Sequence, residues 1–169
     1  RHEITARIDT ELTRIHRLVR ELLDFARPSP MRIIPCDVAA VSSEALSLLS
    51  HQANARHCKV HHVVHPARVH ADPDRLKQVL LNLLLNAAEA MGYQGELTIR
   101  SAEQSGWLVI AIEDSGPGFS KEALARATEP FFTTKKTGSG LGLAVCTSLV
   151  NKMGGRIELS NREMDAKAQ

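Results

Sequence analysis

Aromatic residues and cysteines are both scarce in this chain of 169 residues. Aromatics make up 4% of the sequence, so a hydrophobic core must be built mainly from Leu, Ile, Val and Ala. The three cysteines, Cys36, Cys58 and Cys146, are an odd number at wide spacings with no CxxC pair. This usage favours a reducing compartment over a disulfide framework.

Long apolar runs are also missing. The most apolar stretch, residues 79–91, is interrupted by Asn82, Asn86 and Glu89, whereas a membrane span needs about 18 uninterrupted apolar residues. We therefore expect no membrane contact by this chain. An initiator methionine and a signal peptide are absent, and the first residues already follow a helical pattern, so we expect a fragment of a longer protein.

Neither charge sign is in excess. The 21 basic and 19 acidic residues are interspersed and give a formal charge of +2, which offers no electrostatic case for nucleic acid or for an anionic membrane. Hydrophobic residues at 43% and charged residues at 24% are typical of a soluble globular protein. The length suits one domain with an appendage.

The N-terminal segment follows one helical pattern. Apolar residues recur at steps of four and three, and Pro28 and Pro30 end the pattern. The narrow apolar stripe suits pairing with another helix, although packing on its own domain is an alternative. We expect a helix over 1–28, a linker over 29–36 and a domain over 37–169.

The remaining pattern predicts an α+β fold. Asp37 and Asp72 are candidate N-caps, with Pro73 at a first helical position, and Ser105-Gly106 predicts a hairpin turn. A two-layer α/β sandwich follows, with a mixed sheet and helices on one face. The expected helices are 38–55, 72–91 and 141–153, and the expected strands are 59–64, 68–71, 96–100, 107–113 and 156–160.

The helix over 72–91 carries a polar stripe. It is apolar on its other faces, and steps of three and four place five polar residues on one line: Arg75, Gln78, Asn82, Asn86 and Glu89. A carboxamide facing a dry core is costly unless it is hydrogen-bonded. The stripe therefore faces a polar cavity or water, and an ordinary solvated helix edge is the alternative.

A carboxylate followed by glycines ends the strand over 107–113. The period of two places Asp114 on the inward face with Leu108, Ile110 and Ile112. Gly116 and Gly118 follow, and glycine lets a backbone turn tightly and approach a ligand. Taken alone, this segment favours a plain turn over a ligand site.

The loop over 129–142 has the composition of a phosphate site. Glycine amides, a helix N-terminus and two lysines attract phosphate together, although no Walker A or Rossmann pattern occurs. Two adjacent phenylalanines suggest a hinged lid that packs on the domain. The residues concerned are Phe131, Phe132, Thr133, Thr134, Lys135, Lys136, Gly138, Ser139, Gly140, Leu141 and Gly142.

Four segments together resemble the catalytic domain of bacterial sensor histidine kinases, within the superfamily shared with gyrase, mismatch-repair and chaperone ATPases. Residues 81–87 look like the N box, 114–119 the first glycine box, 129–135 the F box and 138–143 the second glycine box. The likeness covers about residues 35–160. Residues 22–28 are similar to the second helix of the dimerisation and phosphotransfer hairpin, and the F box looks most like that of nitrogen-regulation kinases.

The resemblance implies an ATP-binding kinase core. Asn86 would coordinate Mg²⁺, Asn82 would support the nucleotide, Asp114 would accept from the adenine amino group, and Lys135 with the following amides would hold the triphosphate. The implied nucleotide-binding residues are Asn82, Asn86, Asp114, Gly116, Gly118, Phe131, Phe132, Thr134, Lys135, Gly138, Ser139, Gly140, Leu141 and Gly142.

The resemblance also implies partners. The γ-phosphoryl group would pass to a histidine outside this chain and then to an aspartate of a response regulator. The N-terminal helix would form a homodimer, and the location would be cytoplasmic. A hydrolase of the same superfamily is an alternative, but it normally carries Glu at the position of Asn82. A dimerisation or nucleotide-sensing module that has lost catalysis is another.

Three features depart from the family pattern. The phosphoacceptor box is missing, and although His2 imitates its start, we interpret it as a solvated helix residue. Glu89 stands where many family members have a basic or aromatic residue. The last strand, which usually follows the segment 156–160, is lacking.

Six of the eight histidines fall between His51 and His70, near Cys58. Their residue types are compatible with a metal site, but no structural-zinc spacing is present. Solvated histidines are the preferred interpretation.

Overall fold

The computed structural model describes residues 19, 23, 30–135 and 138–161. The predicted N-terminal helix, with His2 and the expected dimer contact, therefore lies outside the described residues except for Val19 and Leu23. The elements are β1 (Ile34–Asp37), α2 (Val38–Ser50), η1 (Ala53–His57), β2 (Cys58–Val63), β3 (Arg68–Ala71), α3 (Pro73–Ala90), β4 (Gly95–Gln104), β5 (Trp107–Asp114), α4 (Lys121–Arg126) and α5 (Gly142–Lys152).

The main sheet is mixed, as the sequence predicts. Its strand order is β2-β4-β5, with β2 parallel and β5 antiparallel to β4. Ser105 and Gly106 join β4 to β5 with φ of 50° and 80°, which is the positive pair that a tight hairpin turn requires. Strands β1 and β3 form a separate antiparallel pair.

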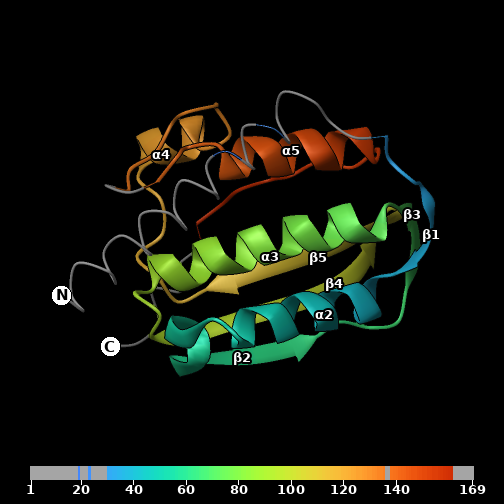
Figure 1. Cartoon of the computed structure of the whole chain (residues 1–169), viewed down its shortest axis with the longest axis horizontal. Helices are drawn as coiled ribbons and strands as arrows, with labels where there is room; N and C mark the ends of the chain where they lie inside the picture. Colours follow the sequence, from blue (N-terminus) through green and yellow to red (C-terminus); the bar gives the residue numbers. More distant parts are fainter. Residues whose placement is uncertain (1–18, 20–22, 24–29, 136–137, 162–169) are drawn as a thin grey trace.

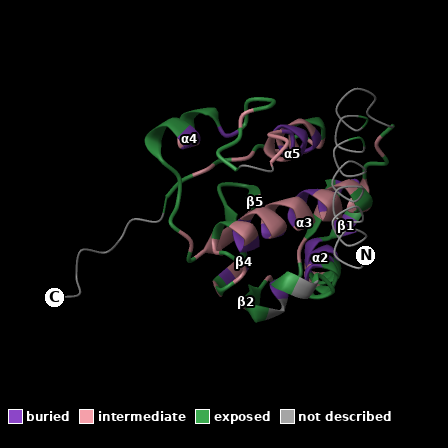
Figure 2. Cartoon of the chain, turned by 60° about the vertical axis from the view of Figure 1, so that its left-hand side comes forward, coloured by how far each residue is buried: buried purple, intermediate pink, exposed green. Residues whose placement is uncertain are grey.

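The helices cover one face of this sheet, and α3 lies between α2 and α5 (Figure 1). Figure 2 shows α3 almost entirely buried or intermediate, whereas β2 and α4 are mostly exposed. The core between helices and sheet includes Leu49, Leu84, Leu97 and Ile99. The predicted two-layer α+β sandwich is thus confirmed.

Helix α3 begins at a buried carboxylate. The Asp72 side chain accepts from the backbone N–H groups of Asp74 and Arg75 at 3.1 and 3.2 Å, and from that of Arg32 at 2.9 Å. Burial raises the pKa of Asp72, but these hydrogen bonds outweigh it, and the pKa lies below its ordinary value. Asp72 therefore caps the helix and ties it to the chain before β1.

Helix α5 packs on α3 through a small core of its own. Val79 on α3 contacts a group that includes Val145, Cys146 and Leu149 on α5. Asn82 and Asn86 follow Val79 by three and seven residues, so all three lie on one face of α3. The same packing therefore brings α5 beside the polar stripe.

Several elements differ in extent from the sequence prediction, and one was not expected. Helix α2 ends at Ser50, and a separate 3₁₀ turn, η1, takes up most of the rest of the predicted helix. Strand β1 begins at Ile34, within the range expected to be linker, because it pairs with β3. Helix α4 was not expected; Ser120 caps it by accepting from the Ala123 N–H.

The predicted strand over 156–160 is wrong for this structure. Exposure alternates along the segment as in a strand, and Ile157 packs against the α5 core. The segment is not hydrogen-bonded into the sheet within the described part of the chain. Alternation reports which way side chains face, whereas a strand also needs a backbone partner.

Candidate functional site

The polar stripe of α3 is only partly accessible to solvent. Arg75, Gln78, Asn82, Asn86 and Glu89 are all half-buried. At the start of the stripe, Arg75 Nη1 donates to Gln78 Oε1 at 2.9 Å. The stripe is therefore neither in a dry core nor fully solvated, and its polar groups remain partly accessible to a ligand.

Asn86 lies where two other segments approach α3. Lys135 Nζ donates to its Oδ1 at 3.1 Å. A Cβ placed on Gly142, the first residue of α5, would be 3.9 Å from its Nδ2. The carboxamide is thus between an ammonium group and a helix N-terminus.

Lys135 also pairs with Glu89. The Nζ to Oε2 distance is 2.6 Å, and the two side chains are 38% and 28% exposed. Asn86 and Glu89 are three residues apart on α3 and lie on one face. The single ammonium of Lys135 therefore bridges two side chains of the stripe.

The N-terminus of α5 carries no side-chain cap. The Leu141 N–H is satisfied by Ser139 Oγ at 3.1 Å, and the first intrahelical bond runs from Val145 N to Leu141 O at 2.8 Å. The N–H groups of residues 142–144 precede that bond and point along the helix axis toward its open end. Such an end attracts anions.

Asp114 lies beside the C-terminus of α3, where the following loop passes close to the Ala90 backbone. Its Oδ1 accepts from the Gly116 N–H at 2.8 Å. A Cβ on Gly116 would be 2.6 Å from that oxygen and 3.5 Å from the Ala90 backbone. Glycine is therefore needed for the loop to pass between α3 and the carboxylate.

A distant asparagine holds this loop. Asn161 Oδ1 accepts from the Phe119 N–H at 2.7 Å, and its Nδ2 donates to the Phe119 carbonyl at 2.8 Å. No sequence pattern marks Asn161, because it follows the last predicted strand in a segment without periodicity. Only the long-range contact reveals it.

The loop before α5 folds back on itself at Gly140. The Phe131 N–H donates to the Gly140 carbonyl at 3.0 Å. Gly140 has φ of 69°, and a Cβ there would overlap the backbone of Phe131. Gly138 makes a second close approach, since a Cβ on it would be 2.5 Å from Thr133 Oγ1.

The two phenylalanines do not behave as one unit. Phe131 has φ of 67° and is 66% exposed, so the expectation that both rings pack on the domain is wrong for Phe131. The left-handed backbone turns its side chain outward. Phe132 is half-buried, and the Arg126 guanidinium lies 4.4 Å from its ring centroid.

The structure brings together most, but not all, of the predicted residues. Asn86, Lys135 and the α5 N-terminus meet at one place, and Asp114 with Gly116 meets the end of α3. Asn82 lies one turn before Asn86 and is half-buried. Thr134 is exposed, and residues 136 and 137 lie outside the described residues.

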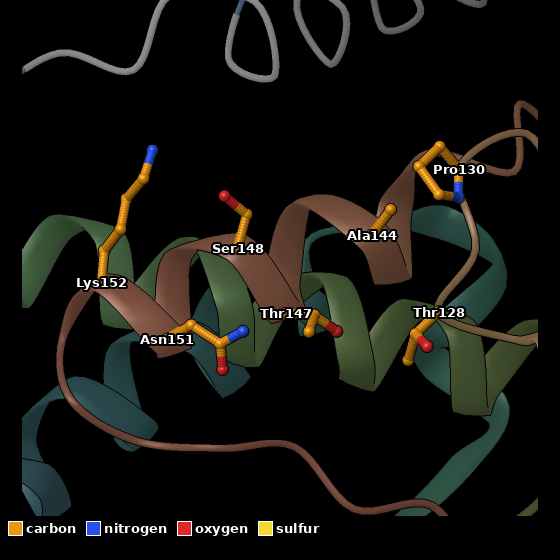
Figure 3. A pocket seen from close by; sticks show the side chains of 7 residues that line it. All are labelled: Thr128, Pro130, Ala144, Thr147, Ser148, Asn151 and Lys152. Carbon is orange, nitrogen blue, oxygen red and sulfur yellow. The ribbon is translucent and has the colours of Figure 1, made fainter.

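A hollow of about 510 Å³ lies elsewhere, along the outer face of α5 (Figure 3). Its lining residues are Thr128, Pro130, Ala144, Thr147, Ser148, Asn151 and Lys152. None of these is a predicted site residue. The hollow is very open and is separate from Asn86 and Asp114.

The histidine-rich segment gathers no candidate metal ligands. Over the described ranges, no three His, Cys, Asp or Glu side chains come together as a cation site. His62 Nε2 is instead 2.8 Å from the Oγ of buried Ser42. Within the same ranges, no helix combines the length and the apolar character of a membrane span.

The groups around Asn86 and Asp114 suit a nucleotide with a divalent cation. A carboxamide oxygen is a suitable Mg²⁺ ligand, and an ammonium group with helix N-terminal amides suits phosphate. The Asp114 carboxylate can accept from an exocyclic amine. At Gly116 and at Gly140 the backbone lies so close to neighbouring atoms that a Cβ would overlap them.

Comparisons with known proteins point the same way. Residues 71–168 match the family described as histidine kinase-, DNA gyrase B-, and HSP90-like ATPase. The chain is 35% identical over 164 residues to the sensor histidine kinase ZraS of Escherichia coli, covering 96% of this chain and 35% of that protein. The chain thus spans about a third of the length of the curated relatives it matches.

Solved structures agree in fold. The catalytic domain of histidine kinase ThkA, in a nucleotide-free form, matches with a TM-score of 0.71 and 32% identity, over 79% of this chain and 90% of that chain. ThkA in complex with the response regulator TrrA matches with a TM-score of 0.77 and 29% identity, over 92% and 46% of the two chains.

Proposed function

This chain belongs to the histidine kinase-, DNA gyrase B- and HSP90-like ATPases, as a catalytic ATP-binding domain of the sensor histidine kinase type, and on that premise we propose that it holds Mg²⁺ and ATP for transfer of the γ-phosphoryl group to a histidine outside the chain. The observation that carries the proposal is the meeting of Asn86 with Lys135 and with the N-terminus of α5.

Asp114 and the group around Asn86 bind different parts of the nucleotide. Asp114 accepts from the adenine amino group, with its orientation fixed by the Gly116 amide. Asn86 coordinates Mg²⁺, and Asn82 supports the nucleotide from one turn earlier. Lys135 and the amides over 138–142 hold the phosphates. The remaining proposed contacts are Gly118, Phe131, Phe132, Thr134, Ser139 and Leu141.

Phosphoryl transfer needs positioning and charge neutralisation more than covalent chemistry by the protein. Mg²⁺, when bound, supplies charge neutralisation at the phosphate oxygens. Lys135 adds a positive charge, and the α5 amides add oriented dipoles without reorganising. The nucleophile is a histidine ring nitrogen, which brings its own lone pair.

The partners follow from the same premise. ThkA is seen in complex with a response regulator, and we propose that the protein containing this chain passes its phosphoryl group to an aspartate of such a regulator. We further propose homodimerisation through residues 1–28 and a cytoplasmic location for this domain.

A two-part experiment tests the function. Calorimetry should detect ADP binding that strengthens with Mg²⁺, and Asn86→Ala should remove most of that Mg²⁺ dependence. With γ-labelled ATP, the chain alone should stay unlabelled, while a separately supplied hairpin carrying an acceptor histidine should be labelled. Glu44→Gln, at an exposed position of α2, serves as the matched control. Acid-labile label on His2, or no nucleotide binding at all, would contradict the proposal.

A further inference from the structure

The Lys135 ammonium occupies a defined position over one turn of α3. It lies 2.6 Å from Glu89 Oε2 and 3.1 Å from Asn86 Oδ1. An ammonium group has donors and no acceptor, so the Asn86 atom facing it is the carbonyl oxygen. This is the oxygen that the proposed function assigns to Mg²⁺.

Two cations are poor neighbours at one carbonyl oxygen. Like charges a few ångströms apart repel, and they repel more strongly at the effective dielectric constant of a protein surface than in water. Mg²⁺ also demands a near-ideal octahedral shell and keeps several waters. The ammonium of Lys135 and a metal ion are therefore alternatives at Asn86 Oδ1.

Glu89 determines the position of the Lys135 ammonium group when no metal ion is bound. A lysine side chain is flexible and its charge is strongly hydrated, so a lone amide oxygen would not hold it. A carboxylate on the same helix face, three residues from Asn86, supplies the opposite charge that does. The contact to Asn86 thus depends on the contact to Glu89.

We propose that Glu89 is a positioning residue that holds the Lys135 ammonium at Asn86 Oδ1, so that Lys135 takes the cation position there in the absence of metal and leaves it when Mg²⁺ with nucleotide binds. This inference rests on the proposed function. It assigns a role to Glu89, whose negative charge would repel the phosphates of the nucleotide.

The test compares ADP binding with Mg²⁺ and with EDTA, by calorimetry. In Glu89→Gln, Lys135 is free to reach the phosphates, so metal-free ADP should bind about fivefold more tightly, while Mg²⁺-ADP should change less than twofold. Lys135→Gln should weaken the binding of metal-free ADP. Glu44→Gln is the matched control, because it breaks another lysine–carboxylate pair that involves α3, Glu44 Oε2 to Lys77 Nζ at 3.0 Å, and should change neither affinity.

A double variant separates positioning from simple charge. In the Lys135→Gln background, Glu89→Gln should have less than a twofold effect, because the residue acts through Lys135. An undiminished effect in that background, or equal changes with and without Mg²⁺, would overturn the inference and leave the proposed function standing. Absence of ADP binding by the unmodified chain would overturn both.

Discussion

The side chain of Asn161 pairs with both polar backbone groups of Phe119, at 2.7 and 2.8 Å. The two residues are 42 positions apart. A Cβ on Gly118 would be 2.8 Å from Asn161 Oδ1, so glycine is needed for this approach. The contact fixes the far end of the loop that begins at Asp114, and it joins that loop to the segment after α5.

Asn161→Ala should therefore loosen the loop over 115–119 without unfolding the domain. Each hydrogen bond contributes about 1 kcal/mol net, so we expect amide protection in the loop to fall by about tenfold or more. Hydrogen exchange measures this. Ser160→Ala, which alters the exposed neighbour, is the control and should leave protection unchanged. Equal protection in Asn161→Ala and Ser160→Ala would show that the contact between Asn161 and Phe119 does not stabilise the loop.

Asp114→Ala should weaken adenine nucleotides selectively. A hydrogen bond to a charged group contributes about 1.5–3 kcal/mol, so ADP affinity should fall by about tenfold to a hundredfold. GDP lacks the adenine amino group, and its binding should change little. Calorimetry with both nucleotides gives the comparison, and Glu103→Ala at the exposed hairpin is the control. Retention of tight ADP binding would rule out the adenine contact.

Gly140→Ala should damage nucleotide binding more than stability. A Cβ at this position overlaps the Phe131 backbone at a φ of 69°, so the loop before α5 must rearrange. We expect ADP affinity to fall about tenfold. Gly106→Ala is the matched control, since Gly106 also has positive φ, of 80°, but faces open space. It should lower the free energy of unfolding by about 1 kcal/mol and leave ADP affinity unchanged.

Asp72→Ala should destabilise the domain by about 1 kcal/mol through loss of the α3 cap. Because hydrogen bonds hold the folded pKa of Asp72 below its unfolded value, the ionised form stabilises the fold above the unfolded pKa, near 3.9. That stability is lost as pH falls from there through the folded pKa. Urea unfolding at pH 7 and pH 3 should show a smaller difference between the two pH values in Asp72→Asn than in the unmodified chain.

Asn82→Glu should raise ATP hydrolysis. Water needs a base to activate it, which contributes about a hundredfold to ten-thousandfold in rate, and the carboxamide of Asn82 cannot accept a proton. The unmodified chain should therefore turn over ATP barely above background. Phosphate release over hours at saturating ATP measures both. Rapid turnover by the unmodified chain, abolished by Asn86→Ala, would instead indicate a hydrolase.

The sequence by itself determined the elements with a strong local cause. Asp72 and Pro73 predicted the start of α3. In the structure the Asp72 side chain caps this helix by accepting from the backbone N–H groups of Asp74 and Arg75. Ser105-Gly106 predicted the hairpin between β4 and β5. Local propensity and periodicity act within a few residues, so they can be read without knowing what the chain packs against.

Tertiary structure alone decided which of the predicted residues meet. Packing of α5 on Val79 brings its N-terminus to Asn86, and the Lys135 contact to Glu89 joins residues 46 positions apart. The segment 156–160 alternates like a strand but has no strand partner among the described residues, because pairing depends on a second segment elsewhere in the chain. Contacts between distant segments depend on the packed core, and no local pattern encodes them.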